Sequence, residues 1–374
     1  MSALLGLCGF VLTQELQHEV SVINIEVPVR VFKGDHFVNT LSIEDFILYE
    51  DGRPQKIEAV YLIKKTSVEK AEKREGSLPA ARPPEVKKRH FALIFEMDDY
   101  VPELNTVVDE FFNKVLAPGD SVWISMPRDT IHLKQEALSK VSKSEIAEQC
   151  KSRLKKAVRW EGGRLRSLLD DLNRINSGDD DLDRQAAYDI AAQITILKTL
   201  DMAALSKFAS ALESLEGQKH VFIFYQREAF RIPRKFLDIF IDNSRKDYID
   251  TGKIRRLFND TSTVIHFLFV TKTQADKDAT PAMGDTHGSI ALFEQGNGDF
   301  FSAFRDLAVM TGGLTESSAN AAFAFKESVE ASENYYLLYY KPSDYKPDGQ
   351  FKKIVVDVKG GGYRVSHRAG YIAK

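Results

Sequence analysis

Three carboxylates stand close together in the run Glu96-Met97-Asp98-Asp99-Tyr100, directly after the apolar residues 91–95. Carboxylate oxygens are the donors that Mg²⁺ and Ca²⁺ prefer, so Glu96, Asp98 and Asp99 are candidate ligands for either metal. Carboxylates this close also repel one another and need a positive charge nearby. The simpler interpretation, which we favour, is an acidic loop that is exposed or paired with Arg227, with no cofactor expected.

Elsewhere the sequence carries little of the chemistry that catalysis requires. Four of the histidines, His132, His220, His266 and His287, are dispersed, and no His-x-x-x-His or Cys-x-x-Cys spacing indicates a zinc site. No Gly-x-Ser-x-Gly motif occurs, and no glycine-rich phosphate loop follows the first buried strand. We therefore expect a protein that is not an enzyme.

The elements around the acidic run place it at the end of a strand. Apolar runs predict buried strands at residues 91–95, 121–126, 221–225 and 264–270, and helical spacing marks residues 101–116, 144–174 and 182–215. This alternation predicts an α/β fold with a doubly wound, mostly parallel sheet. Ligands bind beyond the carboxyl ends of such strands, so we expect the binding edge at residues 96–101 and 226–232.

Both ends of the chain have the two-residue period of β-strands. The odd positions from Ile23 to Val31 are apolar, and Asp51-Gly52 is a hairpin signal. We expect a β-sandwich-like element formed from the N- and C-terminal strands, with the α/β domain inserted between them. The aromatic residues Tyr335, Tyr336, Tyr339 and Tyr340 alternate along one predicted strand, which indicates half core and half exposed surface.

The chain therefore divides into five predicted segments. They are a possible leader (1–19), an N-terminal β-rich element (20–63), a charged linker (64–90), the α/β domain (91–330) and C-terminal strands that pack with the N-terminal element (331–374).

Composition excludes several classes of protein. With 43% hydrophobic and 28% charged residues, the 374-residue chain is typical of soluble globular proteins. Its net charge of −3 does not favour nucleic acid as a partner. The two cysteines are Cys8 and Cys150, so removal of a leader would leave no disulfide.

The main question about targeting concerns the apolar residues 3–12, which are either a leader or a buried N-terminal segment. They are too few to span a bilayer as a helix, and no other stretch is long enough for a transmembrane helix. They resemble the apolar part of a secretory signal, without its positive start or an Ala-x-Ala cleavage site. We expect export to the periplasm, cell surface or exterior, with a cytoplasmic location as the alternative.

Several motifs occur in a family-specific order along nearly the whole chain. They are Glu50-Asp51-Gly52-Arg53-Pro54-Gln55, Leu116-Ala117-Pro118-Gly119-Asp120, Gly217-Gln218-Lys219-His220, Thr311-Gly312-Gly313 and Arg368-Ala369-Gly370-Tyr371. In this order the chain resembles the VWFA-related acidobacterial domain proteins. The resemblance implies a von Willebrand factor A-like fold, usually behind a signal peptide, and no established biochemical activity.

The resemblance also implies where a metal would bind. In the related fold, a metal-ion-dependent adhesion site uses Asp-x-Ser-x-Ser after the first strand and an aspartate after a later one. Here Glu96, Asp98 and Tyr100 stand at the first three ligand positions and Gln226 at the later aspartate. Tyrosine is too long to replace a serine ligand, so the adhesion site is degenerate.

The leading functional hypothesis is a non-catalytic protein–protein interaction module of the cell envelope or exterior. Its unidentified protein partner would dock through Asp98, Asp99, Arg227, Glu228 and Arg231. The alternative is a Ca²⁺- or Mg²⁺-dependent adhesion or sensing domain that uses Glu96, Asp98 and Asp99. A hydrolase on a Rossmann-like sheet would need a serine or cysteine hydrogen-bonded to a histidine in a pocket. The oligomeric state stays open.

Overall fold

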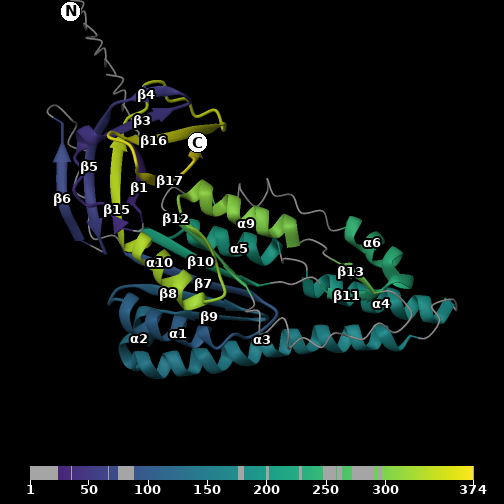
Figure 1. Ribbon diagram of the computed structural model, residues 1–374. Helices are drawn as coiled ribbons and strands as arrows, with labels where there is room; N and C mark the ends of the chain where they lie inside the picture. Colours follow the sequence, from purple (N-terminus) through teal and green to yellow (C-terminus); the bar gives the residue numbers. More distant parts are fainter. Residues whose placement is uncertain are drawn as a thin grey trace, which may run out of the picture.

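A computed structural model describes residues 24–34, 36–65, 67–74, 88–175, 181–198, 202–226, 230–246, 258, 263–271, 290–293 and 297–373. The predicted leader and the candidate residues Arg227 and Glu228 lie outside these ranges. Figure 1 shows a β-rich part at one end of the molecule, an α/β part beside it, and helices that extend beyond the α/β sheet at the far end. Within the described residues, no helix combines the length and the apolar character needed to cross a membrane.

A six-stranded mixed sheet forms the centre of the described α/β part. Its strands are β7 (Arg89–Met97), β8 (Ser121–Met126), β9 (Asp129–Leu133), β10 (Gln218–Gln226), β12 (Thr263–Val270) and β14 (Thr315–Ser318). They lie in the order β14-β12-β10-β7-β8-β9. Neighbours are parallel throughout, except that the edge strand β9 runs antiparallel to β8. The chain order reverses in the middle, between β7 and β10.

Helices cover both faces of this sheet. On one face lie α1 (Glu103–Glu110), which continues as a wider turn to Val115, α3 (Lys143–Arg174) and α10 (Ala321–Glu333). On the other lie α5 (Met202–Glu213) and α9 (Asn297–Thr311). Alternate strand residues supply the two cores: Phe91, Leu93 and Phe95 point to the first face, and Ala92 and Ile94 to the second. The short α2 (Gln135–Lys140) precedes α3.

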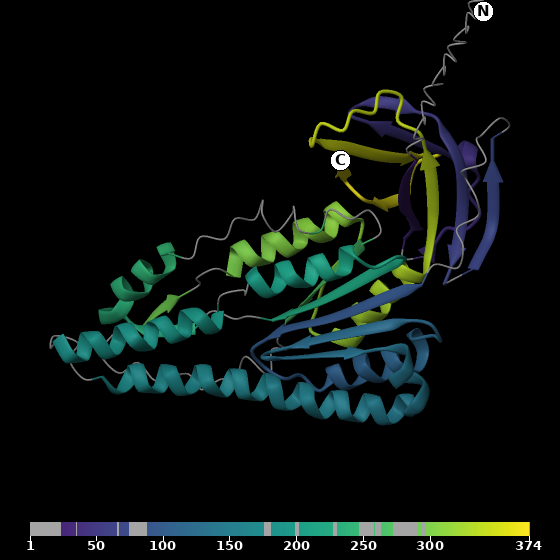
Figure 2. The same cartoon turned by 180° about the vertical axis from the view of Figure 1, so that it is seen from behind.

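The long helix α3 continues past the sheet into a helical extension, which both views show (Figure 1 and Figure 2). There its second half packs with α4 (Asp181–Lys198), α6 (Leu237–Lys246) and β11 (Phe230–Pro233), which pairs with β13 (Ile290–Phe293). The sequence predicted one helix over residues 182–215. The structure has two, α4 and α5, because the first packs in the extension and the second on the sheet.

The β-rich part is assembled from both ends of the chain. One sheet has the order β17-β1-β15-β5-β6 with β2 beside β1, and the other has the order β18-β16-β3-β4. Their strands are β1 (Ile25–Lys33), β2 (His36–Phe37), β3 (Phe46–Glu50), β4 (Arg53–Gln55), β5 (Ile57–Lys64), β6 (Ser67–Lys73), β15 (Asn334–Tyr340), β16 (Phe351–Val358), β17 (Arg364–His367) and β18 (Gly370–Ile372). Apolar side chains of both sheets share one core.

Two expectations for this part need correction. Residues 64–90 are not a linker throughout, because Ser67–Lys73 forms the edge strand β6 against β5. The four tyrosines of β15 are all buried, at 0–7% exposure. Strand β15 is covered on both faces, since Tyr336 and Tyr340 enter the shared core while Tyr335 and Tyr339 pack in a second cluster with Tyr61.

Polar contacts join the two parts at the amino ends of the central strands. The fully buried Arg30 of β1 donates hydrogen bonds to the Ala331 carbonyl, in the last turn of α10, and to the Gly312 carbonyl, just after α9. Helix C-termini carry partial negative charge, so they stabilise this guanidinium. At the same end of the sheet, and within the α/β part, Arg89 at the start of β7 forms a two-pronged ion pair with Asp120 at 2.7 and 3.1 Å.

Candidate functional site

The acidic run lies where the strand order of the central sheet reverses. Met97 is the last residue of β7 and is paired with Gln226, the last residue of β10. The backbone N–H of Asp98 donates to the Gln226 carbonyl over 3.0 Å, so the loop begins between these two strand ends. Open α/β sheets bind ligands in the crevice at this position. The carboxyl edge of the sheet is therefore the leading candidate for a functional site.

Two basic residues, one from α3 and one from α4, neutralise the charge of this loop. The ammonium of Lys198, at the end of α4, pairs with Asp98, and the two side chains are only 10% and 13% exposed. Arg166 of α3 pairs with Asp99 at 3.2 Å, and these side chains are 62% and 36% exposed. Neither cation was singled out by the sequence, which suggested Arg227. The loop is therefore held by internal cations from two different helices.

Helix α3 packs closely against the backbone of the acidic loop because the helix residue at the contact is a glycine. A Cβ atom added at Gly162 would lie 2.2 Å from the backbone oxygen of Asp98, whereas one added at Gly163 would meet nothing within 4 Å. The helix is fixed at its start by Ser142, whose hydroxyl accepts from the Glu145 N–H. Its buried residues Ile146, Ala147, Cys150, Leu154 and Val158 follow a helical period and hold it against the sheet.

The remaining candidate metal ligands do not join Asp98 and Asp99. Glu96 is still part of β7 and lines a cavity on the α5 face of the sheet. The Tyr100 hydroxyl donates to the Asn105 side chain at 2.5 Å. Among the described residues, no group of three His, Cys, Asp or Glu side chains is arranged to hold a metal ion.

Of the candidate residues that follow β10, Arg231 lies among the described residues, and it is apart from the loop. Arg231 is exposed on β11 in the helical extension, and within the described part of the chain it has no ion pair with Asp98 or Asp99. Gln226 is 2% exposed, and among the described residues neither of its amide atoms has a hydrogen-bond partner. An unsatisfied buried amide costs about 1–3 kcal/mol, so Gln226 is an energetically costly residue at the strand reversal.

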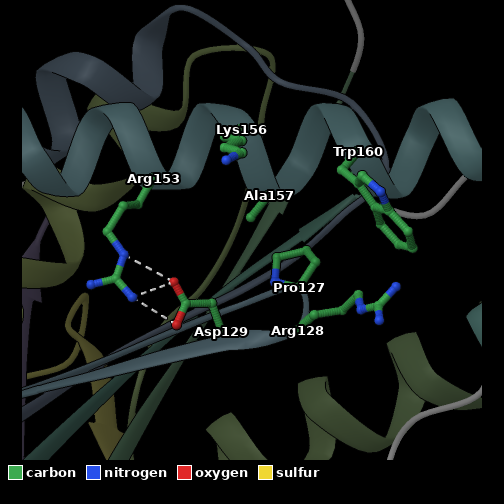
Figure 3. A pocket seen from close by; sticks show the side chains of 7 residues that line it. All are labelled: Pro127, Arg128, Asp129, Arg153, Lys156, Ala157 and Trp160. Atoms are coloured by element: carbon green, nitrogen blue, oxygen red, sulfur yellow. Dashed lines mark hydrogen bonds and ion pairs between the residues drawn. The ribbon is translucent and has the colours of Figure 1, made fainter.

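An open groove of about 440 Å³ lies at the carboxyl end of the neighbouring strand β8. Figure 3 shows its two walls: α3 on one side and the turn between β8 and β9 on the other. The lining residues are Pro127, Arg128, Asp129, Arg153, Lys156, Ala157 and Trp160. Three cationic side chains face one carboxylate, so the lining has a net positive charge.

The Arg153 guanidinium binds Asp129 through both carboxylate oxygens, at 2.6 and 2.8 Å, and this pair closes one end of the groove. At the other end the Arg128 guanidinium lies 4.2 Å from the centre of the Trp160 ring, which is a cation–π contact. Trp160 remains 45% exposed. Lys156 has no ion pair among the described residues, so its charge is available to a ligand.

This groove was not predicted from the sequence, although the sequence contains one signal for it. Residues 153–166 of α3 contain six lysines or arginines and a single glutamate. Arg153, Lys156 and Trp160 are three and four residues apart, which places them on one face of a helix. The opposing wall could not be inferred from this spacing.

A second cavity of about 400 Å³ lies between α5 and strands β7, β8 and β9. Its lining is mostly apolar, with Trp123 and Phe208 among the larger side chains and Glu96, Ser125, Thr130 and Lys207 as the polar ones. It has the size of a small-molecule site. Nothing in its lining specifies one class of ligand.

One serine–histidine contact is present. Ser121 and His90 are paired across β8 and β7, with 2.6 Å between the hydroxyl oxygen and Nδ1. His90 Nε2 is 2.9 Å from the Glu216 carbonyl, so this nitrogen carries the proton and Nδ1 accepts from the serine. Burial lowers the pKa of His90. The pair lies at the amino ends of the strands and is not part of the lining of either cavity described above, so we interpret it as a cross-strand contact.

Comparisons with known proteins add little to this geometry. No protein-family model matches the chain, and no curated protein matches it. Among solved structures, it is similar to an aerotolerance-related membrane protein from Bacteroides fragilis NCTC 9343 carrying multiple mutations to serines. The identity is 7%, the match covers 65% of this chain and 98% of the other, and the TM-score is 0.24. Likeness at this level carries no argument about fold or function.

Proposed function

We propose that this chain is a non-catalytic protein-interaction module that docks its partner at the carboxyl edge of the central sheet. The observation that carries the proposal is the open basic groove between α3 and the β8–β9 turn, with Trp160 exposed at its rim. Exposed tryptophan and arginine are the residues that contribute most to binding energy in protein interfaces. The groove also lies at the edge where sheets of this kind bind ligands.

We further propose a von Willebrand factor A-like, doubly wound fold for the α/β part. The strand order with its central reversal, the antiparallel edge strand β9 and the helices on both faces support this assignment. A place in the cell envelope or exterior is the accompanying proposal, supported by the apolar residues 3–12.

The ion pairs of the acidic loop favour docking that does not depend on a metal. Lys198 already supplies a positive charge to Asp98, and Arg166 supplies one to Asp99. A divalent cation would have to displace the ammonium from a contact that is nearly closed to solvent. These contacts support the metal-independent proposal over the Ca²⁺- or Mg²⁺-dependent alternative.

The test is affinity capture from the native envelope fraction, with quantification of the bound proteins. Three baits are compared: the unchanged chain, Lys156→Glu in the groove, and Lys346→Glu, an exposed lysine of the β-rich part. We expect a specific partner that the unchanged chain and Lys346→Glu retain, that Lys156→Glu loses, and that EDTA does not release. Equal capture by all three baits, or loss on EDTA treatment, would contradict the proposal.

A further inference from the structure

We propose that the partner contributes an extended acidic segment, which adds as a strand to the open edge of β9 and places its carboxylates in the basic groove. This inference rests on the proposed function and specifies the chemistry of the partner. It combines the charge of the groove, the conformation of Arg128 and the edge of β9 that pairs with no described strand.

The charge of the groove selects an anionic ligand. Asp129 is occupied by Arg153 through both of its oxygens, so the cations that remain for a ligand are Arg128 and Lys156. Both are exposed, and complementary charge accelerates association and excludes partners of the wrong sign. Ala157 and Pro127 provide apolar surface between these cations. A peptide with carboxylates beside small apolar side chains fits such a lining.

The backbone of Arg128 supports a binding role for its side chain. The β8–β9 turn consists of Pro127 and Arg128, and Arg128 has a φ of 63°. Glycine or asparagine adopts this left-handed conformation with less strain than other residues. Arginine at this position therefore lowers stability slightly, and its cation–π contact holds the guanidinium at the groove. Strain of this kind is typical of functional positions.

The edge of β9 supplies backbone groups for an added strand. Strand β9 pairs with β8 on one side, and no described strand pairs with the other side. It starts at Asp129, within the groove, so a peptide along its open edge passes the groove directly. Its odd residues Ile131 and Leu133 pack toward the α3 face. Because side chains alternate along a strand, every second residue of an added peptide would face α3 and its cations.

In this binding mode the edge of β9 and the basic groove contribute differently to recognition. Main-chain hydrogen bonds to β9 would supply affinity for any extended peptide, as in other cases of strand addition. The groove would supply specificity by accepting acidic side chains at alternate positions. Sequences with lysine or arginine at these positions would be rejected by Arg128 and Lys156.

The test is selection of peptides of about ten residues from a random display library on the full chain, long enough to span an edge strand. Selected peptides are then synthesised with a fluorescent label and titrated by anisotropy. We expect acidic residues at alternate positions and loss of binding when alternate peptide amides are N-methylated. Binding should also weaken when the salt concentration is raised from about 0.05 to 0.5 M.

Two variants locate the site. Lys156→Glu should weaken binding by about tenfold or more. Arg128→Gly should weaken it too, while the melting temperature is unchanged or higher because glycine fits the turn. This second variant separates loss of binding from loss of folding. Lys346→Glu, far from the groove, should bind normally.

Several outcomes would overturn the inference. These are selection of peptides without acidic bias, unchanged binding by Lys156→Glu and Arg128→Gly, no selected peptide at all, or saturable binding of inorganic phosphate in place of peptide. If a native partner is captured but is insensitive to Arg128→Gly, this inference fails while the interaction function stands. If neither a partner nor a peptide binds, both fail.

Discussion

Replacing Lys198 with methionine removes the charge that neutralises Asp98 and retains most of the side-chain volume. The two groups are 10% and 13% exposed, so the variant takes the Lys198 charge away from a nearly buried carboxylate. Removing one partner of a fully buried pair costs about 3–5 kcal/mol. Because this pair keeps some contact with solvent, we expect the free energy of unfolding to fall by about 2–3 kcal/mol. Urea unfolding measures this value.

A double-mutant cycle with Asp98→Asn isolates the interaction itself, and Arg166→Met is the matched control. The Arg166–Asp99 pair serves the same loop but is largely exposed, so its loss should cost less than about 1 kcal/mol. Equal losses for Lys198→Met and Arg166→Met, or a coupling energy below about 0.5 kcal/mol between Lys198 and Asp98, would refute the reasoning. Because internal cations neutralise the loop, millimolar Ca²⁺, Mg²⁺ or EDTA should not change the melting temperature of the unchanged protein.

Three further predictions follow from other contacts. Gly162→Ala should lower the free energy of unfolding by about 1–3 kcal/mol, because the added methyl group clashes with the loop backbone. Gly163→Ala should raise the free energy of unfolding by up to about 1 kcal/mol, because alanine favours a helix more than glycine does. Chemical denaturation compares the two variants, and equal effects would contradict the close approach of Gly162 to the loop. Burial lowers the pKa of His220 from 6.5 to about 3. The unfolded chain therefore binds the extra proton as the pH falls below about 6.5, and stability should fall by about 1.4 kcal/mol per pH unit from this residue. His220→Phe should flatten that profile, and an unchanged slope would argue against the buried neutral histidine. Ser121 should not react with a fluorophosphonate probe for activated serines, since Ser121 and His90 line neither of the two cavities described above. Labelling of Ser121 seen by mass spectrometry would support a hydrolase function instead.

Much of the architecture follows from local pattern. The apolar run at residues 91–95 and the helical period of residues 144–174 correspond to β7 and α3. The acidic run was predicted to follow a strand at residues 91–95, and this is correct for Asp98 and Asp99 only, because Glu96 and Met97 still belong to β7. In each case, neighbouring residues alone determine which face is buried.

The partners of the acidic run could not be predicted in this way. Asp98 and Lys198 are 100 residues apart in sequence, and Asp99 and Arg166 are 67 apart. These contacts depend on how α3 and α4 cross the strand end, which no local period encodes. One local signal of the close approach is the pair Gly162-Gly163 inside α3, and the structure turns Gly162 toward the loop.

Two predictions, for the segment that forms β6 and for the tyrosines of β15, were wrong because tertiary contacts determine the structure there. Strand β6 has few apolar residues because it lies at an edge, and its pairing with β5 determines its structure. The tyrosines of β15 alternate as expected, but both faces of the strand are covered by other elements. The groove was missed because its second wall, the turn at Arg128, meets α3 only in the folded chain.

Site-specific photocrosslinking tests the proposed docking surface most directly. A photoreactive phenylalanine analogue is placed at Trp160, which is 45% exposed, and in a matched protein at Phe351, which is 44% exposed in the β-rich part. After irradiation in the native envelope fraction, we predict one protein crosslinked through Trp160, with the adduct on an acidic segment, and none through Phe351. The absence of an adduct at Trp160, or the same adducts at both positions, would contradict the account.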